Sequence, residues 1–197
     1  MNTTIATGWW RRNAGWLAGT LVLGALALWL PYWQARQRDL DLHPDIPVTA
    51  KPGQWARFAG ARWRLVSAEV VEPGDRRLRG WLRKDAVVLL LRYEVVRAAG
   101  TDAALFETCR GAVTDAAGRR WEAGPNALPR LAGPRLPSGC GHGLDANGDQ
   151  VTIAPGQPLL FQHAFVLPRA QDVHGLHARI ELSPLAGVAG RHLDVPL

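Results

Sequence analysis

The sequence predicts an all-β domain of the sandwich type, preceded by one N-terminal transmembrane helix. An uncharged apolar stretch of membrane-spanning length lies near the N-terminus. Short strand-like runs, separated by turns that contain Gly and Pro, fill the rest of the chain. After residue 54, no stretch shows a convincing apolar stripe at helical spacing. The domain of about 150 residues is long enough to bury a core without metal ions or several disulfides.

The apolar stretch covers residues 14–33 and predicts the transmembrane helix. No charged residue occurs between Arg12 and Arg36. Twenty helical residues extend about 30 Å, the thickness of a bilayer's hydrocarbon core. Tryptophan and tyrosine residues flank both ends, as expected for rings at the headgroup level. Pro31 is expected to end the helix.

A cleavable signal peptide is the alternative to an anchor. Ala25-Leu26-Ala27 has the small-x-small form that a signal peptidase requires. Cleavage there would leave the apolar residues 28–33 at the new N-terminus. We therefore expect the helix to remain attached, as a signal anchor of a single-pass membrane protein.

The charges on the two sides of the span give little guidance on orientation. Arg11 and Arg12 precede it, and Arg36 and Arg38 follow it, so positive charge is nearly balanced. The cysteine pair and the β domain favour an N-terminus inside the cell. Residues 1–13 are therefore expected to be a short cytoplasmic segment, with the C-terminal domain extracytoplasmic at the cell membrane.

Composition and spacing also bear on partners. The net charge is +6, but the arginines are scattered and only Lys51 and Lys84 are lysines, which is typical of a GC-rich genome. We therefore expect no nucleic-acid partner. Gly15 and Gly19 have the spacing of a close-packed helix pair, which predicts a weak helix-mediated dimer.

The segment after the span, residues 34–53, is polar and contains several Asp and Pro residues. It is expected to be an extended linker. The sandwich domain then covers residues 54–197. Its expected strands are Arg62–Glu72, Ala86–Ala98, Leu105–Thr114, Val151–Ile153, Leu159–Leu167, His177–Leu182 and Leu193–Leu197. Asp115–Gly118 is expected to be a tight turn with a positive φ at its glycine.

Three motifs, in this order, resemble those of bacterial immunoglobulin-like extracellular domains of unknown function. They are the apolar strand Val87–Val96, the hairpin Val113–Trp121, and the Pro-Gly turn Ile153–Gly156 followed by Phe165–Pro168. These domains stand behind single anchors or lipoprotein signals and share a fold with a small secreted mycobacterial antigen. The resemblance implies an immunoglobulin-like β-sandwich outside the cytoplasm and implies no activity. The Gly- and Pro-rich segment 123–150 departs from the family's pattern.

The two cysteines, Cys109 and Cys140, are expected to form a disulfide in an oxidising compartment, although two free thiols would look the same in sequence. The bridge would tie the irregular segment 123–150 to a strand. Closing a loop of about 32 residues stabilises the folded state by roughly 3.5 kcal/mol in the chain-entropy model.

Several loop patterns resemble known kinds of site but lack residues that those sites require. Cys140-Gly141-His142 lacks a second pair of metal ligands at useful spacing. Asp145–Asp149 lacks the glycine and the final glutamate of a calcium loop. Ser138, His142 and Asp145 share one irregular loop without a nucleophile elbow. We therefore expect no catalytic residue, metal or cofactor.

One basic stretch is a candidate interaction surface, with a solvated hairpin as the plainer alternative. It could contact anionic lipid headgroups or an acidic partner. Its members are Arg76, Arg77, Arg79, Trp81, Arg83 and Lys84.

The function expected from the sequence is that of a membrane-anchored, extracytoplasmic, non-enzymatic interaction module. It would bind a protein partner in the cell envelope, as an accessory of a membrane complex. Two alternatives stay open: a small-ligand-binding or enzymatic domain that uses the 123–150 loop, and a secreted protein released by signal cleavage.

Overall fold

The computed structural model describes residues 4–42, 45–79, 82–124, 130–131, 136–144, 147–182, 188 and 190–197. The chain divides into two compact units, residues 1–43 and residues 44–197. The first is a helix and the second is a β domain, and each is described by itself.

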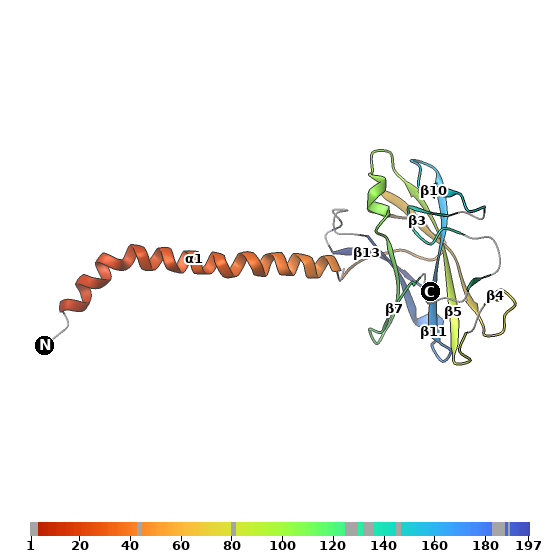
Figure 1. The fold of residues 1–197 in the computed structure, drawn as a ribbon, viewed down its shortest axis with the longest axis horizontal. Coiled ribbons are helices and arrows are strands. Elements are labelled where there is room, and N and C mark those ends of the chain that lie inside the picture. The colour runs from red at the N-terminus through yellow and green to blue at the C-terminus, as the bar shows by residue number, and fades with distance from the viewer. Residues whose placement is uncertain are drawn as a thin grey trace. The chain divides into compact units, whose positions relative to one another are not determined.

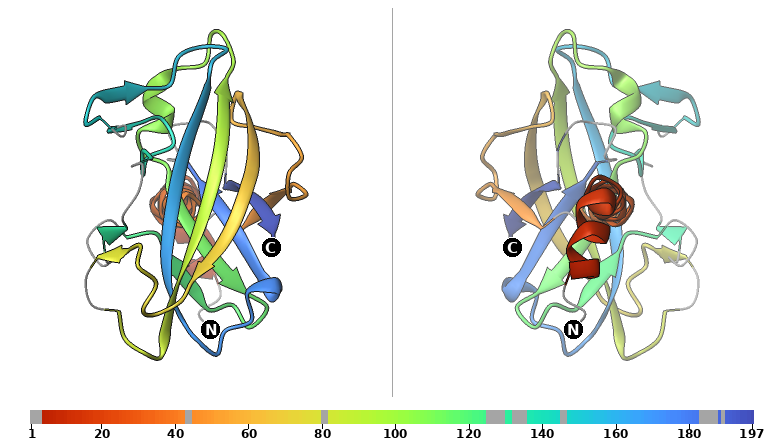
Figure 2. Two further views of the ribbon diagram at one scale, coloured as in Figure 1. Left: turned by 90° about the vertical axis from the view of Figure 1, so that its right-hand side faces the viewer. Right: turned by 90° about the vertical axis from the view of Figure 1, so that its left-hand side faces the viewer.

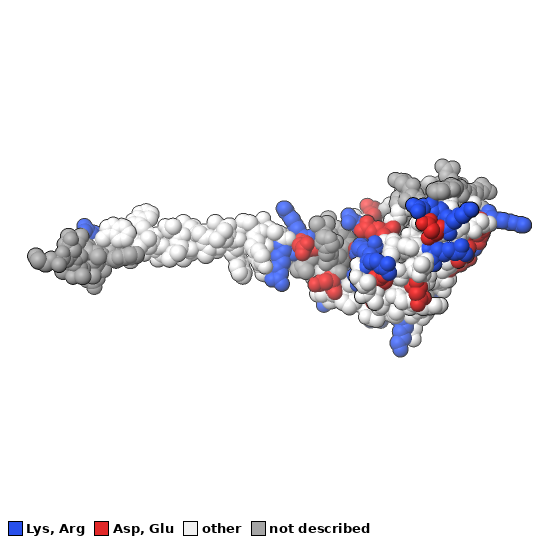
Figure 3. All heavy atoms as spheres, turned by 90° about the horizontal axis from the view of Figure 1, so that it is seen from below, with Lys and Arg blue, Asp and Glu red and all other residues white. Residues whose placement is uncertain are grey.

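The first unit is one helix, α1, which spans Thr4–Leu42 (Figure 1). Its segment Arg12–Arg36 is long and apolar enough to cross a membrane or to serve as a signal sequence. The side chains here are solvent-exposed, and Figure 3 shows the middle of the helix without charged groups. Pro31 lies inside the helix and does not end it. A proline removes one backbone N–H, and the remaining bonds of a 39-residue helix carry the chain past it.

The segment expected to be an extended linker, residues 34–53, contains regular structure. Helix α1 includes its first part, because residues 34–42 are mostly Gln, Ala, Arg and Leu, which favour helix. Residues Ile46–Thr49 form strand β1, where Ile, Val and Thr favour an extended backbone. The β domain therefore begins about ten residues earlier than expected.

The β domain consists of two main sheets (Figures 1 and 2). The first has the order β1-β13-β12-β6-β7, formed by β1, Arg191–Pro196, Leu176–Glu181, Arg110–Asp115 and Arg120–Glu122. The second has the order β11-β5-β3-β2, formed by Pro158–Pro168, Ala86–Arg97, Ala61–Val71 and Ala56–Phe58. Two small ladders pair β4 (Leu78–Arg79) with β8 (Arg130–Leu131) and β9 (His142–Leu144) with β10 (Gln150–Thr152).

The core lies between the two main sheets. Alternate residues of β3, β5 and β11 point inward and are fully buried, among them Trp63, Tyr93 and Phe161. Their rings contact one another, with 5.2 Å between the Tyr93 and Phe161 centroids and 6.1 Å between those of Trp63 and Phe161. Residues of β6, β12 and β13 close the same cluster from the other sheet. The predicted all-β sandwich is confirmed.

One predicted strand starts later than expected. Residues Ala103–Phe106 form the 3₁₀ helix η1, which includes the start of the expected strand Leu105–Thr114. The strand β6 begins only at Arg110. The Asp102 carboxylate accepts a hydrogen bond from the Ala104 N–H, which favours a helical turn. Phe106 then points into the core, fully buried. A second 3₁₀ turn, η2 (Val173–Gly175), precedes β12.

Candidate functional site

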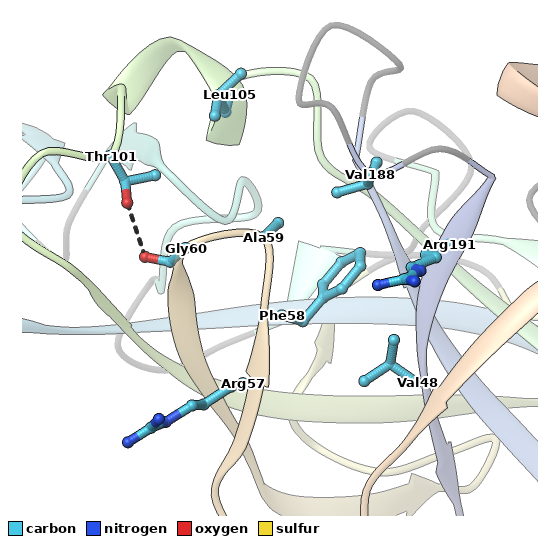
Figure 4. A pocket seen from close by; sticks show the side chains of 9 residues that line it. All are labelled: Val48, Arg57, Phe58, Ala59, Gly60, Thr101, Leu105, Val188 and Arg191. Atoms are coloured by element: carbon cyan, nitrogen blue, oxygen red, sulfur yellow. Dashed lines mark hydrogen bonds between the residues drawn. The ribbon is translucent and has the colours of Figure 1, made fainter.

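The β2–β3 hairpin forms one end of the second sheet and positions the most distinctive charged groups of the domain. Its two-residue turn, Ala59-Gly60, has positive φ at both positions, 51° and 70°. Such a turn matches the twist of the flanking strands, although alanine is strained there. The Gly60 carbonyl accepts hydrogen bonds from the Ala98 N–H and the Thr101 hydroxyl, both at 3.0 Å, which fixes the turn (Figure 4).

The hairpin register places Arg57 directly opposite Arg62. Both residues are exposed, and neither forms an ion pair within the described part of the chain. Like charges directly across a strand pair are destabilising. We call these two side chains the arginine pair.

Trp55 immediately precedes β2, and its side chain lies on the same face of the hairpin as the arginine pair. The guanidinium carbon of Arg64 lies 4.8 Å from the Trp55 ring centroid, and that of Arg62 lies 5.4 Å from it. Arg64 also pairs with Glu94 on β5, so its charge is balanced. Trp55 is 40% exposed, which leaves part of its ring open to a partner.

A groove of about 670 Å³ lies beside the arginine pair, and we call it the hairpin groove. The hairpin forms one wall, and the end of β5 with the 155–156 turn forms the other. Arg97 also lines the groove, but its guanidinium binds the backbone carbonyls of Ile153 and Thr101. Arg97 therefore holds the wall in place, whereas the arginine pair remains open for a ligand.

A smaller cleft of about 370 Å³ lies on the other side of the hairpin turn. Figure 4 shows Phe58, Val48, Val188 and Arg191 gathered there, while Arg57 points away from them. The cleft thus combines apolar side chains with two arginines in its lining, Arg191 and Arg57.

The predicted basic surface, Arg76–Lys84, is only partly described. Arg77 pairs with Asp75 and Glu69, at 2.8 and 2.6 Å, and its hydrogen bonds lower the pKa of Asp75 to about 2. Arg83 pairs with Asp85 at 2.8 Å, which raises the arginine's pKa. Trp81 and the side chain of Arg79 lie outside the described residues. An interaction role for this stretch stays a prediction.

The same stretch has a structural role. Leu78 and Leu82 pack on a second apolar cluster, which lies on the outer face of the β11-β5-β3-β2 sheet and consists of Val71, Val88, Leu90 and Ala164. The leucines between the basic residues therefore cover apolar surface, which explains why charged and apolar residues alternate here.

The predicted disulfide between Cys109 and Cys140 is present. The two Cα atoms lie 5.8 Å apart, and the bridge joins the residue before β6 to the segment before β9. It therefore ties the Gly- and Pro-rich segment to the first sheet, as expected.

His163 on β11 lies beside this disulfide. One ligand atom from each of Cys109, Cys140 and His163 falls within 4.8 Å of the other two. The His163 ring is 3% exposed and contacts the Phe161 and Tyr93 rings, with centroids 5.2 and 5.8 Å away. Burial lowers the pKa of His163 to about 4, only partly opposed by a hydrogen bond to the Ser138 backbone. The imidazole is therefore neutral at physiological pH.

The remaining loop candidates do not come together. Ser138 is exposed, and its backbone rather than its hydroxyl reaches His163. His142 lies half-buried on β9 and belongs to no metal-ligand group among the described residues. Asp145 lies outside the described residues. Gly148 adopts a positive φ of 88°, which is typical of a glycine in a turn.

Sequence reasoning missed His163 and the arginine pair. The alternation along β11 could have grouped His163 with Phe161 and Phe165, whose side chains point to the same face. The opposition of Arg57 and Arg62 follows from the register of a three-residue strand, which the sequence pattern does not reveal.

No family model matches the chain, and no curated protein matches it. Solved structures with a similar arrangement include the secreted protein MPT63 from Mycobacterium tuberculosis, with 13% identity, a TM-score of 0.42, and coverage of 77% of this chain and 98% of that one. The yjhA protein from Bacillus subtilis has 10% identity and a TM-score of 0.44, with coverage of 75% of this chain and 98% of that one. An uncharacterised β-sandwich protein from Clostridium difficile 630 has 8% identity and a TM-score of 0.43, with coverage of 79% of this chain and 95% of that one. At such values the strand order of this chain remains the evidence for its fold.

Proposed function

We propose that this chain is a membrane-tethered interaction module that acts outside the cytoplasm. The apolar segment of α1 is the anchor, and the β domain binds an acidic segment of a partner protein in the hairpin groove. The observation that carries the proposal is the arginine pair, because two opposed guanidinium groups without a counter-ion among the described residues are a ready receptor for carboxylates.

The chemistry of this groove favours binding over catalysis. Arginine stays charged at all accessible pH values, so it does not transfer protons. Its planar fork of N–H donors matches a carboxylate in two-point contact. The exposed part of the Trp55 ring lies beside Arg62 and offers apolar contact area next to the charge.

The strand β2 adds a second means of recognition. It is the outer strand of its sheet, so one of its edges is available to an extended peptide. A bound segment could therefore add backbone hydrogen bonds along β2 while its carboxylates reach the arginine pair. The three-residue length of β2 keeps this edge short, which limits unwanted strand pairing.

The anchor and the disulfide support the proposed location. A tether confines the domain to the membrane surface and raises its effective concentration near a membrane-bound partner. The Cys109–Cys140 bridge is the form that persists in oxidising compartments.

Site-specific photo-crosslinking in living cells tests the proposal. A benzophenone amino acid at Ala99, which lines the hairpin groove, is expected to capture a specific partner. The same probe at Leu160, which is 40% exposed on β11, is the control position and should not.

Charge reversal then distinguishes the two candidate surfaces. Arg57→Glu with Arg62→Glu should abolish the Ala99 crosslink, whereas Arg76→Glu with Lys84→Glu should leave it unchanged. The opposite pattern would assign partner binding to the basic stretch and contradict the proposed groove.

A further inference from the structure

We propose that reduction of the Cys109–Cys140 disulfide creates a largely buried binding site for one Cu⁺ ion, with His163 as the third ligand. This site shares no residue with the hairpin groove, so the inference stands or falls independently of the proposed function.

The three ligand atoms lie near the spacing that one ion requires. They lie within 4.8 Å of one another in the disulfide form. Bonds of about 2.3 Å to sulfur and about 2.0 Å to nitrogen place the ligands of a trigonal ion roughly 3.7–4.0 Å apart. After reduction, the two sulfurs must separate, and the imidazole and the sulfurs must approach one another by up to about 1 Å to reach these distances.

The imidazole is held in a state suited to coordination. Its Nδ1 atom is buried and has no hydrogen-bond partner among the described residues, while the ring donates a hydrogen bond to the Ser138 backbone. A ligating histidine usually donates its other N–H to such a carbonyl, which fixes the ring orientation. A buried nitrogen without a partner is destabilising, and coordination is one way to satisfy it.

The space around the ring is reserved for it by a glycine on the facing strand. A β-carbon added at Gly111 would lie 2.1 Å from the His163 Nδ1 atom. Gly111 lies in β6, two residues after Cys109, whose sulfur belongs to the same group as a His163 ring nitrogen. The facing sheet thus leaves room for the His163 ring close to the disulfide.

The ligand set favours a soft, low-coordinate ion. Two thiolates and one imidazole suit Cu⁺, which accepts three ligands. A structural zinc site requires four, and no further His, Cys, Asp or Glu joins the group among the described residues. The aromatic neighbours Tyr93, Phe161 and Phe165 shield the imidazole side of the site from water, which otherwise supplies a fourth ligand.

The redox step needs an external dithiol as reductant. The dithiol gives two electrons and two protons, the Cys109–Cys140 S–S bond breaks to two thiols, and the dithiol becomes a disulfide. Cu⁺ then displaces one proton from each cysteine to solvent, while the neutral imidazole donates its lone pair. The disulfide form, which has no thiolate, is expected not to bind the ion.

Titration with Cu⁺ in competition with a chromogenic chelator tests the proposal. The full chain is held in detergent micelles and reduced with a dithiol, and the dithiol is then removed in the absence of air. We expect one Cu⁺ per reduced chain and none for the oxidised chain. His163→Gln should weaken Cu⁺ binding at least about tenfold. His142→Gln, at the histidine two residues after Cys140, should leave it unchanged, and the Cys109→Ser/Cys140→Ser double variant should abolish it.

X-ray absorption at the copper edge on the wild-type chain avoids any dependence on a variant's folding. Two sulfur neighbours and one nitrogen neighbour support the site. Three results would overturn the proposed site. One is a coordination shell of sulfur alone, and another is loss of Cu⁺ binding in His142→Gln rather than in His163→Gln. The third is retention of Zn²⁺ under conditions where the chelator removes Cu⁺.

Discussion

The buried imidazole of His163 makes the stability of the β domain depend on pH in a way that can be worked out in advance. Its pKa falls from 6.5 to about 4 on folding, because burial disfavours the charged ring. The folded state therefore binds fewer protons than the unfolded state between these two values. Stability from this group is fully present above pH 6.5 and is lost as the pH falls toward 4.

The size of the effect follows from the same two pKa values. Protonation of the unfolded state alone lowers the unfolding free energy by about 2 kcal/mol between pH 7.5 and pH 5, and by roughly 3 kcal/mol at pH 4. Two kcal/mol is a large part of the stability of a typical domain. The effect is therefore within reach of ordinary denaturation measurements.

The assay is urea unfolding of residues 44–197 at pH 7.5 and pH 5 with the disulfide intact. His163→Phe keeps a ring among the aromatic neighbours and removes the titrating group. The wild type should lose about 2 kcal/mol more than this variant between the two pH values. Variant His174→Gln, at an exposed histidine, should lose as much as the wild type. Equal losses of unfolding free energy in the wild type and in His163→Phe would show that the His163 imidazole is not the group responsible.

Three further outcomes follow from the fold. The Cys109→Ala/Cys140→Ala double variant should lose roughly 3.5 kcal/mol of unfolding free energy relative to the oxidised wild type, measured by urea denaturation, because it frees a loop of about 32 residues. Residues 44–197 should fold alone, whereas residues 50–197, which lack β1, should be less stable by about 1–3 kcal/mol, because each lost ladder bond contributes about 1 kcal/mol. Gly111→Ala should lower the melting temperature, because the added methyl overlaps the imidazole, at a cost of about 1–3 kcal/mol.

The long strands could be predicted because their signal is local. The alternation along residues 62–72 and the apolar run at 86–98 correspond to β3 and β5 within one or two residues. The turn at Asp115–Gly118 was equally readable, and Gly118 has the expected positive φ of 79°. These features depend on neighbours in sequence, which a pattern reports directly.

The features that were missed depend on partners far away in the chain. The short strand β1 exists because β13, some 145 residues later, pairs with it in parallel. Polar residues 34–42 looked like a tether by composition, but their high helix propensity continues α1. Phe106 lies in a 3₁₀ turn, and this turn places its ring in the core between the two sheets.

The candidate sites divide in the same way. The Cys109–Cys140 bridge could be anticipated from an even cysteine count, which needs no knowledge of the fold. His163 joins the two cysteines only because the two sheets face each other. The arginine pair depends on the register of the hairpin, because a slip of one residue would move one of the two side chains to the other face of the sheet.

The proposed location of the β domain outside the cytoplasm, behind a membrane anchor, is open to a direct measurement. Two reporters fused separately after Leu197 give the measurement: a phosphatase that is active only outside the cytoplasm and a fluorescent protein that matures only inside it. The account predicts an active phosphatase and a dark fluorescent protein, both in the membrane fraction. A fluorescent fusion with an inactive phosphatase would place the domain in the cytoplasm and contradict the account.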